Sequence, residues 1–184
     1  GYERISMHGV RRALLEQQAT SLQLPLEQVR IPIQASNAIY EAAMRDVLKR
    51  YQARGVWRVV FGDLFLQDIR DYRERNLATL NMSGVFPLWL KDTHLLAREF
   101  IAMGFRAILV CIDPKQLDPS FCGREFDDSL LSELPSSADP CGENGEFHTF
   151  VYDGPIFRRP VEVVRGEIVH REGFWFCDLQ PRAT

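Results

Sequence analysis

A polar, glycine-bent run that passes directly into an aromatic strand is the feature that most restricts the fold. Residues Cys141 to Thr149 include two glycines, two carboxylates, an amide, a thiol and an imidazole. Such a run has too few apolar residues for a core and too much turn chemistry for a helix interior. Residues Phe147 to Tyr152 have the aromatic and β-branched content of a strand. The sequence predicts a loop held rigidly on a strand, either to present functional groups or merely to satisfy its own backbone.

The composition is that of an ordinary globular chain, with 184 residues, of which 46% are hydrophobic and 26% charged. A net charge of −3 argues against a general nucleic-acid surface. No apolar run approaches the ~20 residues of a membrane span. The four cysteines lie far apart without a C-x-x-C pair, which favours reduced thiols over a disulfide framework. We therefore expect a cytoplasmic protein that binds neither membranes nor nucleic acid directly.

Helical and strand patterns alternate up to Gly104, and β-rich sequence dominates after Phe147. The pattern predicts helices over residues 8–22, 36–54, 66–80, 92–103 and 126–134. It predicts strands over 29–33, 57–61, 85–89 and 106–112, followed by two or three strands broken by Gly154-Pro155, Gly166 and Gly173. We expect an α/β domain over residues 1–104 and a smaller α+β domain over 105–184. Asp63 follows Gly62 at the carboxyl end of a predicted buried strand, where open α/β sheets bind ligands.

The chain resembles the diphthine–ammonia ligase family, a group of ATP pyrophosphatases, along nearly its whole length. The most specific element is the run Glu143-Asn144-Gly145-Glu146-Phe147-His148-Thr149. The other matching segments are Met7-His8-Gly9-Val10, Gln18-Ala19, Leu24-Pro25, Phe61-Gly62-Asp63, Tyr72-Arg73-Glu74, Phe86-Pro87-Leu88-Trp89, Gly123-Arg124 and Asp153-Gly154-Pro155-Ile156-Phe157. This resemblance implies a Rossmann-like (HUP-type) parallel sheet flanked by helices, followed by a smaller α+β domain.

The resemblance also implies an ATP-dependent amidation with ATP and Mg²⁺ as cofactors. In the family, ATP adenylates the carboxylate of diphthine on elongation factor 2, pyrophosphate leaves, and ammonia displaces AMP. Activation is chemically necessary because a carboxylate does not react with ammonia at neutral pH; the enzyme supplies positioning and stabilises phosphate charge. A bacterial member would act on a different small carboxylate. The resemblance leaves a homodimer open.

Site residues carry over from the family in three groups. The nucleotide would contact His8, Gly9, Gly62 and Asp63, with Asp63 holding Mg²⁺ or a ribose hydroxyl. The acidic loop would supply the catalytic groups Glu143, Glu146 and His148, as a base, an ammonia-orienting carboxylate or a proton shuttle. Substrate contacts would come from Asn144, Gly145, Thr149 and Arg124. No residue is assigned as a ligand in a dedicated protein metal site.

The sequence departs from the family at its start. The family opens with a strand and a Ser-Gly-Gly-Lys-Asp-Ser loop that grips the ATP phosphates, and nothing of that kind occurs here. We therefore expect the natural protein to carry about one more βαβ unit, of the order of 30 residues, before Gly1. A chain of only these residues should not hydrolyse ATP.

Several plainer interpretations stay open. Asp63 could be a turn or cap residue, His8 a surface histidine, His148 a backbone-bonded histidine and Arg73 a salt-bridge partner. Two rival chemistries are a thiol nucleophile formed by Cys141 with His148, and a zinc site drawn from Cys111, Cys122, Cys141 and His148. A non-catalytic nucleotide-binding module is the alternative to a ligase.

Overall fold

The computed structural model describes residues 4–5, 8–32 and 35–182, and these form two compact units. One unit combines residues 1–26 with 92–184, and the other comprises residues 27–91. The units divide the chain at different places from the predicted domains 1–104 and 105–184, which stay a prediction. Among the described helices, none is long and apolar enough to cross a membrane.

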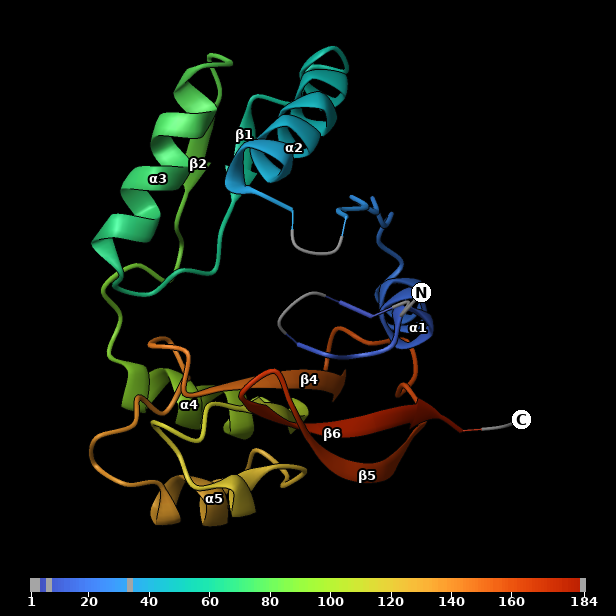
Figure 1. Cartoon of the computed structure of the whole chain (residues 1–184), viewed down its shortest axis with the longest axis vertical. Coiled ribbons are helices and arrows are strands. Elements are labelled where there is room, and N and C mark those ends of the chain that lie inside the picture. The colour runs from blue at the N-terminus through green and yellow to red at the C-terminus, as the bar shows by residue number, and fades with distance from the viewer. Residues whose placement is uncertain (1–3, 6–7, 33–34, 183–184) are drawn as a thin grey trace. The chain divides into compact units, whose positions relative to one another are not determined.

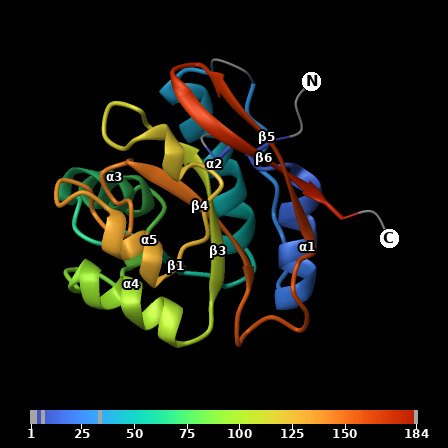
Figure 2. The same cartoon turned by 90° about the horizontal axis from the view of Figure 1, so that it is seen from below.

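The larger unit is built on a four-stranded antiparallel sheet with strand order β4-β3-β6-β5 (Figure 1). Its strands are β3 (Arg106–Ile112), β4 (Phe147–Asp153), β5 (Val163–Arg171) and β6 (Phe174–Pro181). Its helices are α1 (Arg12–Leu22), α4 (Thr93–Ala102) and α5 (Asp128–Glu133), with a 3-10 turn at Pro119–Phe121. Figure 2 shows α4 and α5 together on one side of β3 and α1 on the other.

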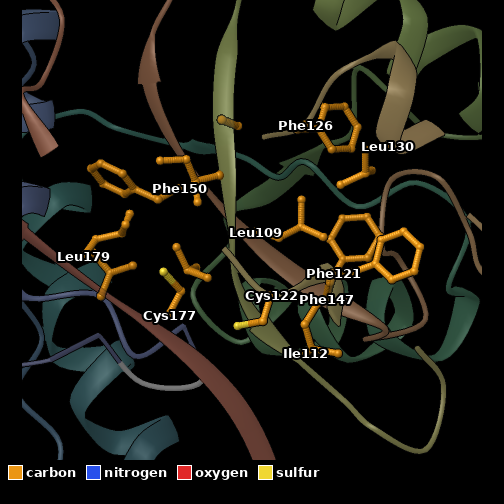
Figure 3. Close-up of a cluster of buried hydrophobic side chains, with 14 of the residues drawn as sticks. Leu109, Ile112, Phe121, Cys122, Phe126, Leu130, Phe147, Phe150, Cys177 and Leu179 are labelled. Atoms are coloured by element: carbon orange, nitrogen blue, oxygen red, sulfur yellow. The ribbon is translucent and has the colours of Figure 1, made fainter. Parts of the chain in front are cut away.

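Strand β3 runs through the centre of the core of this unit. Six of its seven residues are buried, because it is paired on both sides and covered on both faces. Figure 3 shows Leu109 and Ile112 of β3 among aromatic side chains that include Phe126, Phe147 and Phe150. Burial of this apolar surface, at roughly 25 cal/mol per Å², is the main stabilising term of the unit.

The amino-terminal segment belongs to this antiparallel unit. Arg4 and Arg11 form an isolated antiparallel bridge and both bind the carboxylate of Asp178 on β6, at 2.8 and 2.7 Å. Leu14 of α1 is fully buried in the same core. These contacts join residues more than 160 positions apart, so a division of the chain by sequence order alone separates segments that pack together.

The smaller unit is a β1–α3–β2 arrangement with one additional helix. Strands β1 (Arg58–Val60) and β2 (Ser83–Val85) pair in parallel, and α2 (Asn37–Gln52) and α3 (Gln67–Ala78) lie beside them (Figure 1). The described residues thus give an α/β chain with a two-stranded parallel sheet, not a larger Rossmann-like sheet. The strand predicted to be buried at residues 57–61 exposes 66% of Val60.

Two further strand predictions are wrong. Residues 29–32 form no strand, and position 33 lies outside the described residues. In the second segment, predicted over residues 85–89, the strand ends at Val85, Phe86 has no regular structure, and residues 87–90 form a turn. Gly166, predicted to break a strand, lies inside β5 at a register shift, where a Cβ atom would be 2.7 Å from the Asp178 carbonyl oxygen. A bulge accommodates the close approach.

Candidate functional site

Hydrogen bonds within the loop between α5 and β4 fix its conformation. Oδ1 of Asp139 accepts hydrogen bonds from the backbone N–H groups of Cys141, at 2.9 Å, and Glu143, at 3.3 Å. Gly142 and Gly145 take the left-handed backbone conformation, with φ of +70° and +85°. We call residues 139–146 the acidic loop. The prediction of a glycine-bent loop held on a strand is confirmed.

Glu146 is the buried anchor of the acidic loop. The residue is only 1% exposed, and its Oε1 accepts hydrogen bonds from the Asp139 backbone N–H at 2.7 Å and from Asn144 Nδ2 at 3.1 Å. Its Oε2 has no hydrogen-bond partner among the described residues. Since a buried carboxylate is costly unless it is hydrogen-bonded, these contacts give Glu146 a structural function. Half-buried Glu143 and exposed Asn144 are the more accessible groups of the loop.

Neighbouring segments hold the acidic loop from two sides. The backbone N–H of Asp113 donates to the Glu146 carbonyl at 3.0 Å, and Gln116 Nε2 donates to the Asn144 carbonyl at 3.3 Å. On the other side, the Cys141 thiol donates to the Thr93 carbonyl at the start of α4, at 3.4 Å. Gln116 was missed by the sequence reasoning because nothing in its local pattern shows that it reaches the loop.

The two loop glycines allow a matched test of this geometry. A Cβ at Gly142 would lie 2.8 Å from the Phe147 carbonyl oxygen, whereas at Gly145 the nearest described atom is 4.0 Å away. We expect Gly145→Ala to lower the free energy of unfolding by about 1 kcal/mol, the cost of the left-handed backbone alone. Gly142→Ala should cost about 2 kcal/mol because a steric clash is added. Urea unfolding measures both, and equal costs would contradict the close approach.

His148, on β4 two positions after the acidic loop, stacks on His8. The ring centroids are 4.4 Å apart and the rings are inclined by 22°. Burial, together with the neighbouring His8, lowers the pKa of His148 to about 4. Burial also lowers the pKa of His8, against a hydrogen bond to the backbone of Thr149. The structure therefore joins two predicted site residues into one pair of neutral imidazoles at neutral pH.

Gly9 lets the backbone approach β6 closely beside this pair. A Cβ at Gly9 would lie 2.5 Å from the ring of Phe176 and 3.1 Å from Nη2 of Arg171. The Arg171 guanidinium lies over the Phe176 ring at 4.5 Å. Arg171 places a cation close to His8 and Gly9, the two residues predicted to contact the nucleotide. The sequence did not indicate Arg171, because β5 lies far from Gly9 along the chain.

Asp63 and Gly62 lie in the smaller unit, and the Asp63 carboxylate is already paired. Arg73 Nη2 donates to its Oδ1 at 3.0 Å, and Arg73 Nε approaches Oδ2 at 2.8 Å without hydrogen-bond alignment. Magnesium prefers open carboxylate oxygens in octahedral geometry, so Asp63 in this arrangement does not fit Mg²⁺. No described atom lies within 4 Å of a Cβ built at Gly62.

The remaining predicted substrate residues are Arg124 and Thr149. The Arg124 guanidinium forms a bidentate pair with Glu133, at 2.7 and 2.8 Å, so a substrate carboxylate would have to displace Glu133. Thr149 lies half-buried on β4 directly after His148. The acidic loop, His148 and Thr149 are thus contiguous, whereas the side chain of Arg124 is engaged elsewhere.

The structure gives no support to the two rival chemistries. Burial, with the charges of Asp139 and Glu143, raises the pKa of Cys141 to about 12, and the thiol is bonded to the Thr93 carbonyl. A nucleophilic thiol requires the opposite shift. All four cysteines are free, and within residues 4–5, 8–32 and 35–182 no group of three or more His, Cys, Asp or Glu residues is placed to hold a metal ion.

Comparison with known proteins identifies the region that contains the acidic loop. A family model described as the diphthamide synthase C-terminal domain matches residues 92–183. Curated diphthine–ammonia ligases from Schizosaccharomyces pombe, Homo sapiens and Mus musculus are 30%, 31% and 33% identical to the chain, and each alignment covers 56% of it. The alignments cover 18% of the S. pombe relative and 41% of the human and mouse relatives, so the chain spans less than half of their length. The chain belongs to the diphthine–ammonia ligase family, and residues 92–183 are its diphthamide synthase C-terminal domain.

Proposed function

We propose that the chain is part of an ATP-dependent ligase that converts a carboxylate into an amide with ammonia. The observation that carries the proposal is the acidic loop, which Glu146 anchors from inside while Glu143 and Asn144 stay accessible. A loop braced in this way can hold polar groups in a fixed geometry, which is the main requirement for positioning two reactants. ATP would supply the leaving group that a free carboxylate lacks.

Within this proposal the loop and the histidines have different functions. Glu143 would orient ammonia and take up the one proton that the attacking nitrogen loses as the amide forms and AMP leaves. His148, with a pKa of about 4, is a weak base at neutral pH and would serve as a hydrogen-bonding group instead. Asn144 and the Gly145 backbone would contact the substrate, which gives the loop both a binding and a proton-accepting part.

The acceptor that we propose is diphthine, the substrate in the names of the relatives. A different small carboxylate is the alternative for the same chemistry. The reduced cysteines fit a cytoplasmic enzyme of this kind.

Formation of AMP and pyrophosphate by the full-length protein tests the proposal. ATP, ¹⁵N-ammonium and either diphthine-bearing elongation factor 2 or a panel of small carboxylates would be supplied, and the amide detected by mass spectrometry. Glu143→Gln should lower kcat/KM about 100-fold without loss of fold, and Glu99→Gln, an exposed change on α4, is the matched control. Binding of ATP without AMP formation for every acceptor would instead favour a nucleotide-binding module.

A further inference from the structure

A separate cleft of about 440 Å³ lies in the larger unit, between α4, α5 and the connection that leads to the acidic loop. This volume is within the range of sites for small molecules, about 300–1,000 Å³. All residues that line it belong to one compact unit. Neither Glu143, Glu146, His8 nor His148 lines it, so the cleft is not accounted for by the proposed ligase chemistry.

Helices α4 and α5 both line the cleft with a charged residue that is followed, about one turn later, by an apolar residue. Helix α4 contributes His94, Arg98 and Ile101, at positions i, i+4 and i+7. Helix α5 contributes Asp128 and Leu131, at i and i+3. On each helix the charged or titratable residue comes first and the apolar residue lies toward the carboxyl end. The cleft therefore combines an apolar wall with charged groups of both signs.

The charged groups of the cleft are unpaired. Arg98 and Asp128 form no ion pair with each other, and neither has a hydrogen-bond or ion-pair partner in the described part of the chain. By contrast, Arg73 and Arg124 of the same chain are each held by a carboxylate. A cation and an anion that face one concave space without meeting are complementary to a ligand that carries both charges.

We propose that this cleft binds a small zwitterion with an apolar side chain, of the free amino-acid class. Arg98, with His94 beside it, binds the carboxylate of the ligand, and Asp128 binds its ammonium group. Ile101 and Leu131 cover the apolar side chain. Because Pro140 lines the cleft and adjoins Cys141, which is bonded to Thr93 at the start of α4, an occupant also contacts the base of the acidic loop.

Three probes with the same branched apolar side chain test the carboxylate and the ammonium group of the ligand one at a time. Leucine carries both, 4-methylpentanoate lacks the ammonium group, and 3-methylbutylamine lacks the carboxylate. Titrations of the ¹⁵N-labelled protein, followed by backbone amide shifts, should give saturable changes for leucine centred on α4 and α5. Since a charge-assisted hydrogen bond contributes about 1.5–3 kcal/mol, each truncated probe should bind at least about tenfold more weakly.

Variants assign each charge to its residue. Arg98→Gln should abolish the preference for leucine over 3-methylbutylamine, and Asp128→Asn the preference over 4-methylpentanoate. Ala102→Leu should block all three probes by filling the cleft, while Arg75→Gln, an exposed arginine of the smaller unit, should change nothing. Binding that does not saturate, or leucine preferences that survive both charge variants in folded protein, would overturn the proposal. The ligase proposal does not depend on this result, because its test measures AMP formation.

Discussion

Replacement of Glu146 by alanine should lower the free energy of unfolding of the larger unit by about 4 kcal/mol. The side chain is 1% exposed, and its Oε1 accepts hydrogen bonds from the Asp139 backbone and from Asn144. Truncation leaves the Asp139 N–H without its acceptor, at about 1–3 kcal/mol for a buried donor, whereas the amide of exposed Asn144 can bond to water instead. The cavity adds a further cost, because the surrounding core collapses only partly.

Two substitutions distinguish a structural function of the Glu146 carboxylate from a catalytic one. Glu146→Gln keeps the shape and a carbonyl acceptor and should cost only about 1–2 kcal/mol. Glu143→Gln, three positions earlier in the loop and more accessible, should change stability by less than about 0.5 kcal/mol. Urea unfolding with hydrogen exchange at β4 amides assigns the effect to the correct unit. A folded Glu146→Gln protein that has lost all turnover would show that the carboxylate acts in catalysis and not only as an anchor.

Elements that are specified by local chemistry could be predicted from the sequence. The helices predicted to start near residues 36 and 92 begin at caps of short polar residues, because the side chains of Ser36 and Asp92 accept hydrogen bonds from the backbone N–H groups of Ile39 and Leu95. The strand over residues 106–112 was predicted with its observed bounds, because a continuous apolar run that ends at an aspartate is a strong local signal. These features depend on neighbours within a few positions.

Long-range features could not be predicted in the same way. The helix that begins at Arg12 was assigned to the first domain by its position, whereas Leu14 is buried in the core built on β3. The segment Phe86–Trp89 has the composition of a strand, yet the chain turns there. A preference for extended backbone is decided by partner strands, and the sequence does not show which partners are available.

The candidate site residues were predicted from the family resemblance, and the structure adds how deeply each of them is buried. The sequence shows two carboxylates three positions apart but not that a turn brings the Asp139 N–H to one of them. The same limit applies to His8 and His148, which are 140 positions apart and stack in the structure. The functional roles of these residues stay a prediction, and only the fold distinguishes the buried side chain of Glu146 from the more accessible Glu143.

The stacked histidines should make the larger unit sensitive to mild acid. The unfolded pKa of a histidine is about 6.5 and the folded pKa of His148 is about 4. Between these values the unfolded chain binds a proton that the folded chain does not, so stability falls as the pH falls. At about 1.4 kcal/mol per pH unit, His148 alone accounts for a loss of about 2 kcal/mol at pH 5 and about 3 kcal/mol below pH 4. The lowered pKa of His8 acts in the same direction.

Urea unfolding of the wild-type protein and of His148→Gln at pH 7.5 and pH 5 isolates this effect. The variant should lose about 2 kcal/mol less than the wild type between the two pH values, because glutamine does not titrate. His170→Gln is the matched control, since His170 is exposed on β5. Titration of the imidazole C–H resonances by NMR gives the two pKa values directly. If His148 titrates near 6.5 in the folded protein, the ring is solvated, and the close pair with His8 that supports the candidate site does not exist in solution.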